Sequence, residues 1–333
     1  MNVAAVYRST RGDRDRFVLD RRGARPAHDP WRHQGLLVED ERTADGTIAR
    51  VATIFLTGRE CPWRCVMCDL WQHTIPDDTP HGALVRQLDD GLATLAAQGP
   101  LPRHIKLYNA GNFFDPRAVP ECDYTAIADR LGSFAKVIVE SHPALIGDRL
   151  SRFSAALAGA THGADRPGLE VAMGLETAHP GALARLNKGF TLGQFAHAAG
   201  RLCREGVGLR VFLLVGVPFI DPSQQQDWIA RSVSFAFECR ATAVSLIPTR
   251  PGNGALEDLG VVRPTLADLE EALERALQRA PGRVFADLWN LDRFANCPSC
   301  FAARQDRLRR MNLGQRAYPS HVCAECGGPG QRA

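Results

Sequence analysis

The chain has 333 residues, 45% of them apolar, with 40 basic and 37 acidic side chains and a formal net charge of +3. This length and apolar content suffice for the core of one barrel-sized domain with appendages. The small net charge does not indicate the strong positive field of a nucleic-acid-binding protein. The longest apolar run, residues 211–220, is too short to span a bilayer, so we expect no membrane association.

The first 47 residues form an arginine-rich segment with mixed acids and little periodicity. We expect them to be an N-terminal extension that wraps the following domain or is partly disordered. Residues 1–17 carry charges without a following apolar stretch, so the sequence shows no secretory signal. We therefore expect a cytoplasmic protein, whose ten cysteines stay reduced and are available for metals.

From about residue 48 onward, apolar runs typical of strands alternate with helical patterns. The expected strands span residues 51–57, 104–108, 136–140, 169–174, 209–215 and 243–247, with 283–289 as a candidate seventh. The expected helices run from 79 to 99, from the capping box of Thr191 and Gln194 to about 206, from 222 onward, and from 266 to 281.

This alternation predicts a parallel sheet with right-handed crossovers. We expect an α/β fold of the partial (βα)6, TIM-like barrel type, in which the loops after the strands carry the active site. An open doubly wound sheet is the structural alternative. The expected parts are the N-terminal extension (1–47), the barrel (48–282) and a small cysteine-rich metal module (283–333).

Three cysteines follow the first expected strand with the spacing Cys-x3-Cys-x2-Cys: Cys61, Cys65 and Cys68. Three thiolates at this spacing can ligate three irons of a 4Fe-4S cluster and leave the fourth iron open for chemistry. A zinc site or a disulfide is the alternative, with His73 as a fourth ligand. Structural zinc takes four protein ligands, and no fourth cysteine lies nearby, so the pattern favours the cluster.

The triad and the strand pattern resemble those of the radical S-adenosylmethionine (SAM) enzymes. Five motifs between residues 55 and 220 resemble, more narrowly, the radical SAM subunit of archaeosine synthase; elongator-type enzymes are more distant. These motifs are Cys-x-Met-Cys, Gly-x-Phe-x-Asp-Pro at 111–116, Val-Glu-Ser-x-Pro at 139–143, Gly-Leu-Glu-Thr at 174–177 and Asn-Lys-Gly-Phe-Thr at 187–191. His142 replaces the arginine of the subfamily's Glu-Ser-Arg-Pro motif.

The resemblance implies reductive cleavage of SAM at the cluster to a 5′-deoxyadenosyl radical, which abstracts hydrogen from a substrate. It also implies that the triad cysteines are the catalytic ligands and that the loops after the strands bind SAM. The implied SAM contacts are Met67, Asn109, Gly111, Asn112, Glu140, Ser141, Glu176, Lys188, Val217 and Ser245, with Thr249, Arg250 and Asn253 facing SAM or substrate. Taken singly, these residues also fit plain βα turns, helix caps or ion pairs.

Near the C-terminus, two Cys-x2-Cys pairs supply four thiolates: Cys297, Cys300, Cys323 and Cys326. This pattern favours structural zinc, with an auxiliary 4Fe-4S cluster and free thiols as alternatives. Five arginines lie between the pairs, at 304, 307, 309, 310 and 316. They could contact phosphates, but a solvated face paired with Asp306 is the preferred interpretation.

The sequence therefore predicts a cytoplasmic radical SAM enzyme with a 4Fe-4S cluster, SAM and a second metal site. Its substrate is unidentified, with a modified nucleoside or transfer RNA as candidates, and a reductant such as flavodoxin or ferredoxin is expected. One alternative is a sulfur-inserting or methylthio-transferring radical SAM enzyme with an auxiliary cluster at the C-terminal cysteines. The other is a non-catalytic, metal-stabilised RNA-binding module.

Overall fold

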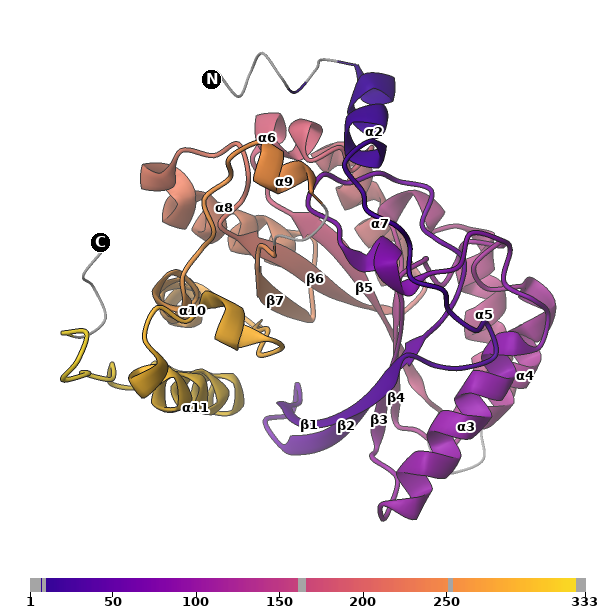
Figure 1. Cartoon of the computed structure of the whole chain (residues 1–333). Coiled ribbons are helices and arrows are strands. Elements are labelled where there is room, and N and C mark those ends of the chain that lie inside the picture. Colours follow the sequence, from indigo (N-terminus) through magenta and orange to yellow (C-terminus); the bar gives the residue numbers. More distant parts are fainter. Residues whose placement is uncertain (1–6, 8–9, 161–165, 251–253, 328–333) are drawn as a thin grey trace.

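One sheet of eight strands, joined in sequence order, forms the centre of the computed structural model, which describes residues 7, 10–160, 166–250 and 254–327 (Figure 1). The strands are β1 (Gly35–Arg42), β2 (Ile48–Leu56), β3 (His104–Asn109), β4 (Lys136–Glu140), β5 (Gly168–Glu176), β6 (Gly208–Val215), β7 (Ala243–Pro248) and β8 (Arg283–Ala286). Strands β2 to β8 are parallel, and β1 pairs antiparallel with β2. No helix among the described residues is long and apolar enough to cross a membrane.

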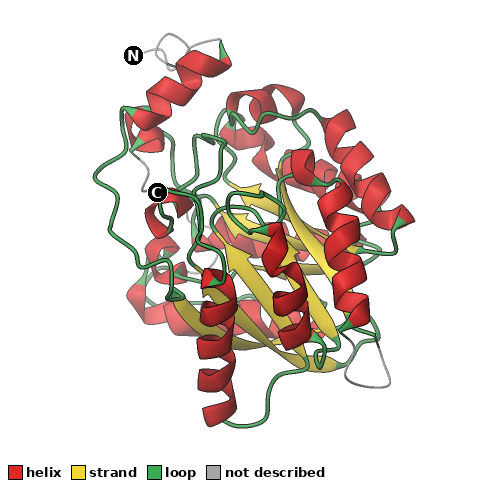
Figure 2. Cartoon of the chain, turned by 90° about the vertical axis from the view of Figure 1, so that its right-hand side faces the viewer, coloured by secondary structure: helices red, strands yellow, loops and turns green. Residues whose placement is uncertain are grey.

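Most of the helices lie in the connections between successive strands, whereas the first precedes β1 and the last follows β8 (Figure 2). They are α2 (Arg11–Leu19), α3 (Ala83–Ala97), α4 (Tyr124–Leu131), α5 (Asp148–Gly159), α6 (Pro180–Arg185), α7 (Leu192–Arg204), α8 (Gln225–Glu238), α9 (Ala255–Asp258), α10 (Leu266–Arg279) and α11 (Pro298–Gly314). Short 3-10 turns cover Leu70–His73, Glu121–Asp123, Pro143–Leu145, Pro222–Gln224 and Leu291–Phe294. The expected capping box of Thr191 and Gln194 starts α7, so that prediction is confirmed.

The prediction of a partial barrel is confirmed, and the doubly wound alternative is wrong. A doubly wound sheet reverses its strand order, whereas this order runs from β1 to β8 without reversal. The sheet curls but does not close, because β1 and β8 pair with no strand on their outer sides in the described part of the chain. The triad follows the second strand, since β1 lies within the segment expected to be an extension. The division at residues 47 and 282 stays a prediction.

Helix α11 covers the open side of the curled sheet, where it packs against both β1 and β8 (Figure 1). Two carboxamides of this helix bond to the free backbone edge of β8. Asn312 accepts from Ala286 N–H and donates to its carbonyl, at 2.8 and 2.9 Å, and Gln315 does the same to Val284. These groups satisfy an edge that would otherwise expose unpaired backbone, and they fix α11 as a wall of the barrel.

The amino ends of the strands are closed by a buried network of charges. Arg210 donates to Glu170 at 2.8 Å and pairs with Glu41, and Lys106 pairs with Glu39 and Glu41 at 2.8 and 2.9 Å. Burial alone would raise the pKa of Glu170, but Arg210 and then Lys136 lower it to about 2. Every charge of this layer has a partner, so we assign it to the fold and not to ligand binding.

Candidate functional site

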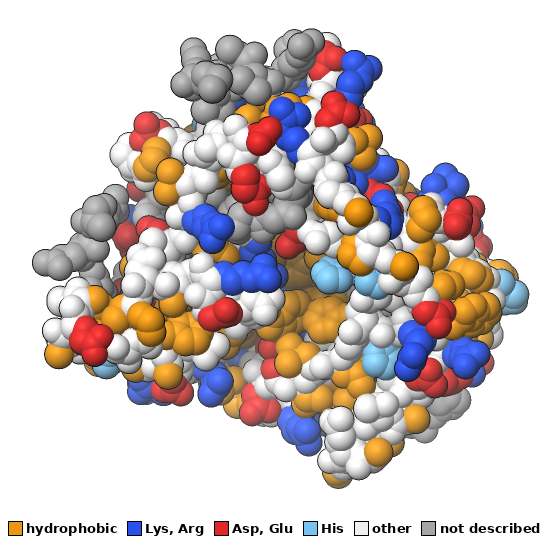
Figure 3. Space-filling view, in the orientation of Figure 1, with side chains coloured by type: hydrophobic (Ala, Val, Ile, Leu, Met, Phe, Trp, Pro, Cys, Tyr) orange, Lys and Arg blue, Asp and Glu red, His pale blue; other side chains and the backbone are white. Residues whose placement is uncertain are grey.

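A cavity of about 770 Å³ opens between the curled sheet, the loops after its strands and α11. Figure 3 shows the hollow on this face of the molecule, with hydrophobic side chains inside it and Lys, Arg and His side chains at its rim. The volume lies within the range of small-molecule and cofactor sites. All three cysteines of the triad line this cavity.

The triad loop follows β2 directly, and the extension residues Arg22 and Arg25 hold it in place. Both guanidinium groups pair with the carboxylate of Glu60, the residue before the first cysteine, and Arg22 lies 2.6 Å from it. Burial raises the pKa of Cys61 to about 11 and that of Cys65 to about 12. The triad cysteines form no disulfide, so their thiols are free to bind a cationic group. Each thiol loses its proton on binding, and the positive charge of the bound group then stabilises the thiolate.

The spacing of the triad sulfurs argues against one metal ion. In the described part of the chain, two sets of three or more His, Cys, Asp or Glu ligand atoms lie within 4.8 Å of one another, and neither contains a triad cysteine or His73. Two sulfurs bonded at about 2.3 Å to one tetrahedral zinc lie only roughly 3.8 Å apart. At least one pair of triad sulfurs therefore lies more than 4.8 Å apart, which fits a multi-iron cluster better than a single ion.

The loop after β3 supplies polar atoms that lack partners. Asn109 lines the cavity and is only 4% exposed. The oxygen and the nitrogen of its side-chain amide are both buried, and neither makes a hydrogen bond. At Gly111 a Cβ would lie 2.4 Å from the carbonyl oxygen of Arg59, so only glycine fits there. An unpaired, buried amide beside the triad is suited to bind a polar ligand.

Asn112, in the same loop, makes two side-chain hydrogen bonds. Its Oδ1 accepts from the His142 backbone N–H at 2.7 Å, and its Nδ2 lies 3.2 Å from Cys61 Sγ. His142 stacks on Trp63 of the triad loop, with ring centroids 3.6 Å apart. Burial, followed by the nearby Lys188, lowers the pKa of His142 to about 3, so the ring is neutral.

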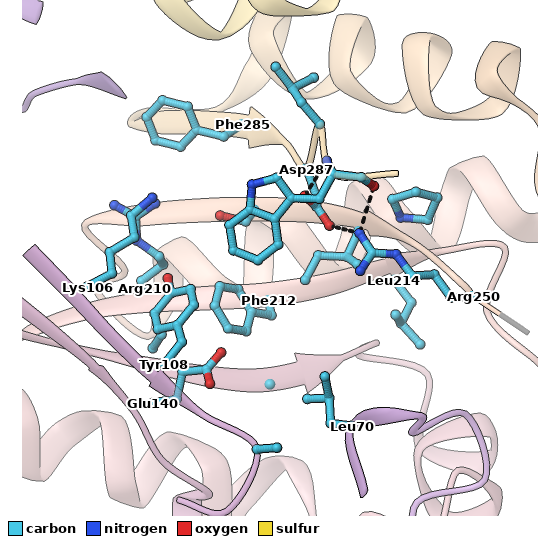
Figure 4. Close-up of a pocket in the computed structure, with 18 of the residues that line it drawn as sticks. Leu70, Lys106, Tyr108, Glu140, Arg210, Phe212, Leu214, Arg250, Phe285 and Asp287 are labelled. Atoms are coloured by element: carbon cyan, nitrogen blue, oxygen red, sulfur yellow. Dashed lines mark hydrogen bonds and ion pairs between the residues drawn. The ribbon is translucent and has the colours of Figure 1, made fainter. Parts of the chain in front are cut away.

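Glu140, at the end of β4, has a carboxylate with no hydrogen bond or ion pair among the described residues, and Figure 4 shows it pointing toward the cavity. Burial raises the pKa of this carboxyl to about 8, with the negative charge of Glu176 adding to the rise and Lys188 opposing it. The next residue, Ser141, lines the same cavity and makes only a long contact of 3.5 Å to the His142 carbonyl. Both side chains therefore remain available to a ligand.

Glu176 and Lys188 bond to each other, and their expected contacts with SAM stay predictions. Lys188 Nζ lies 2.8 Å from Glu176 Oε1, and the two side chains are about nine-tenths buried. Burial alone would lower the pKa of Lys188, but Glu176 raises it above its usual range, so Lys188 keeps its positive charge. Both residues line the cavity, yet each already has one strong partner.

The three other predicted contacts differ in position. Met67 and Ser245 line the cavity, whereas Val217 does not. Val217 is 2% exposed and packs in an apolar cluster with Leu214 and Ile220, against which Met67 also rests. The expected direct contact of Val217 is thus not supported, because the turn after β6 directs it into the core. Thr249 is buried, Arg250 lines the cavity, and Asn253 lies outside the described residues.

The sequence reasoning missed an aromatic wall. Tyr108, Phe212 and Phe285 come from β3, β6 and β8 and lie around the cavity (Figure 4). Trp289, from the segment after β8, also lines it. Asp287 pairs with Arg250, which also donates to the Trp289 carbonyl at 3.0 Å. The available signal was the alternation of side chains within each strand, which places residues 106 and 108, or 210 and 212, on one face.

The C-terminal cysteines form a compact set of four ligands. Sγ of Cys297 and Sγ of Cys323 are 3.9 Å apart, as are those of Cys300 and Cys326, and all four lie within 4.8 Å. These separations match the roughly 3.8 Å edge of a tetrahedral zinc–thiolate site. The set therefore fits a single ion better than an iron–sulfur cube.

The arginines of α11 have different roles. Arg304 and Arg307 point inward and pair with Glu270, and Arg307, 2% exposed, also donates to the Tyr318 carbonyl. Arg310 pairs with Asp306, as the preferred interpretation expected for this face. Arg309 alone of the five lines the cavity. The helix is therefore not a continuous basic surface.

Comparison with known proteins agrees with the resemblance predicted from the motifs. The chain is 25% identical over 289 residues to archaeosine synthase subunit beta of Methanosarcina acetivorans, covering 81% of each. Among solved structures, the Elp3 protein of Methanocaldococcus infernus has 13% identity and a TM-score of 0.47, over 60% of this chain and 51% of that one. TsrM of Kitasatospora setae, a radical SAM methyltransferase, has 17% identity and a TM-score of 0.40, over 58% and 36%.

The chain thus spans about a third to a half of these two solved proteins, and both likenesses are too distant to indicate an activity. No model of a known protein family matches the chain. The predicted resemblance to the archaeosine-synthase subunit is confirmed at the level of sequence similarity.

Proposed function

We propose that this chain is a radical SAM enzyme whose cluster is ligated by Cys61, Cys65 and Cys68. One observation carries the proposal: the buried thiol of Cys65, the half-buried thiols of Cys61 and Cys68, and the unpaired polar groups of Asn109 and Glu140 line a single cavity large enough for a cofactor and a substrate. Three thiols that do not all lie within 4.8 Å of one another, beside a cavity with polar groups that lack partners, support an open-site iron–sulfur cluster over a single ion.

When bound, the cluster and SAM would supply one-electron cleavage of the sulfonium and hydrogen abstraction. The protein's own residues bind and orient these groups. Asn109 offers a carboxamide, and Glu140 a carboxyl, to the amino and hydroxyl groups of SAM. Met67 supplies an apolar surface at the triad, and the ion pair of Glu176 and Lys188 keeps the wall beside the triad rigid.

A modified nucleoside, free or within transfer RNA, is our proposed substrate. The proposal takes its direction from the archaeosine synthase relative and is supported by the aromatic wall. Tyr108, Phe212 and Trp289 present ring surfaces to the cavity, on which a flat heterocycle can stack for about 1–3 kcal/mol per base. The pairing of most α11 arginines within the protein argues against the purely RNA-binding alternative.

At the C-terminal site we propose zinc. The four sulfurs fit one tetrahedral ion, which disfavours the sulfur-inserting alternative because that reaction requires an auxiliary cluster there. Such an ion would fix the start of α11, and α11 in turn closes the barrel beside the substrate cavity. We also propose a cytoplasmic location, where thiols stay reduced, and a flavodoxin or ferredoxin as electron donor.

Anaerobic purification with metal analysis and electron paramagnetic resonance (EPR) tests this function. We expect about four irons and one zinc per chain, and an EPR signal of the reduced cluster that changes shape when SAM is added. About eight irons without zinc would favour the auxiliary-cluster alternative. An EPR signal of the reduced cluster that stays the same when SAM is added would contradict the proposal.

A further inference from the structure

We propose that Asn112 is a positioning residue that donates a hydrogen bond to Cys61 Sγ and so raises the reduction potential of the cluster. The inference rests on the proposed function, since it concerns a group that the triad would bind. Asn112 is 8% exposed, and its Nδ2 lies 3.2 Å from the sulfur. Hydrogen bonds to cluster sulfurs are one of the means by which a protein sets the potential of an iron–sulfur group.

The orientation of the Asn112 amide follows from its second contact. The backbone N–H of His142, 2.7 Å away, can only donate, so the amide atom facing it must be the oxygen. The other amide atom, which faces Cys61, must then be the NH2 group. The N–H···S hydrogen bond therefore does not depend on how the two amide atoms are assigned.

The backbone on both sides of Asn112 is also fixed. Gly111 fits closely against the carbonyl of Arg59, and Phe113 N–H donates to the Glu140 carbonyl at 2.8 Å. The His142 ring stacks on the ring of Trp63, a residue that lies between Cys61 and Cys65 in the sequence. The donor is thus held in place before any ligand binds, and its orientation costs little when the cluster is reduced.

No other side chain among the described residues donates a hydrogen bond to a triad sulfur. Cys61 also receives the backbone N–H of Trp63, and Cys68 that of Leu70. Backbone donors of this kind come with the loop, whereas the side-chain donor can be removed by substitution. Asn112 also lines the cavity and keeps its second amide N–H, so its expected contact with SAM stays a prediction.

Midpoint potentials of the reconstituted cluster, measured by EPR-monitored redox titration, test the inference. Asn112→Ala removes the donor without adding charge, and Asn112→Asp keeps the acceptor for His142 N–H but loses the donor. Both should lower the potential, by about 59 mV if the equilibrium ratio of reduced to oxidised cluster at a fixed potential falls about tenfold. Asn109→Ala and Asn109→Asp make the same chemical changes at a buried amide without a sulfur partner and serve as matched controls.

Equal shifts in the Asn112 and Asn109 pairs would overturn the inference, because they would reflect general polarity or charge. A second measurement does not depend on the variants. In wild-type protein labelled with ¹⁵N-asparagine, the reduced cluster should show a ¹⁵N hyperfine coupling, and its absence would also overturn the inference. Wild-type protein that forms no cluster at the triad would instead contradict the proposed function.

Discussion

Lys188 and Glu176 form a buried ion pair of 2.8 Å in space that only a glycine at position 174 leaves free. A Cβ at Gly174 would lie 2.3 Å from Glu176 Oε1 and 2.9 Å from Lys188 Nζ. Glu176 itself has a left-handed backbone with φ of 67°, at an irregularity in the pairing of β5 and β6. The Gly-Leu-Glu-Thr and Asn-Lys-Gly-Phe-Thr motifs therefore each supply one residue of the same buried ion pair.

Gly174→Ala should displace this pair and lower the free energy of unfolding by about 1–3 kcal/mol, as overpacking does elsewhere. Chemical denaturation measures the change. Gly159→Ala is the matched control, since nothing lies within 4 Å of its added methyl group at the end of α5. Equal stability of the two variants would show that the pair tolerates the methyl group and that the motif has another basis.

Removal of one C-terminal ligand should loosen α11 without affecting the triad. Cys323→Ser should lose the zinc and increase hydrogen exchange in α11 and in β8, whose edge Asn312 and Gln315 cover, while triad iron stays constant. Cys203→Ser, at an exposed thiol outside both metal sites, is the control. Loss of triad iron in Cys323→Ser, but not in the control, would mean that the two sites are not independent.

The buried charge network predicts a stability that falls in acid. The pKa of Glu170 is about 2 in the folded chain, against an ordinary value of 4.5, so its contribution is full above about pH 4.5 and is lost as pH falls toward 2. Glu170→Gln should cost about 3 kcal/mol at neutral pH, because Arg210 loses a buried partner, and should flatten this pH dependence. Denaturation at pH 7, 4.5 and 3 measures both.

Asp148→Asn, at an exposed pair with Arg201, should leave both the stability and its dependence on acid nearly unchanged. An acid slope in Glu170→Gln as steep as in the wild type would contradict the role given to the network.

The parallel strands and several helices could be predicted because their signals are local. Apolar runs that end in turn residues predict β3 and β4. The capping box of Thr191 and Gln194 predicts the start of α7. Strand β1 was missed because its sequence, Gly-Leu-Leu-Val-Glu-Asp-Glu-Arg, reads as charged. Its acids Glu39 and Glu41 point inward to Lys106 and Arg210, residues far along the chain, and no local pattern shows such pairs.

The candidate site divides in the same way. Cysteine spacing indicated both candidate metal sites, since the candidate ligands of each lie on one or two short segments. The pairing of Glu176 with Lys188 and the inward turn of Val217 depend on how separate loops meet, which spacing does not reveal. The aromatic wall combines residues of β3, β6, β8 and the segment after β8, so its members became recognisable only once the strand order was known.

The central claim is that the triad holds a cluster with one iron open to SAM. The most direct measurement is 5′-deoxyadenosine released from SAM by anaerobic, reduced protein, compared between wild type and Cys65→Ser. We predict release by the wild type, none above background by Cys65→Ser, and an unchanged zinc content in both. Equal release by the two proteins, or a wild-type cluster that never cleaves SAM under reduction, would contradict this account.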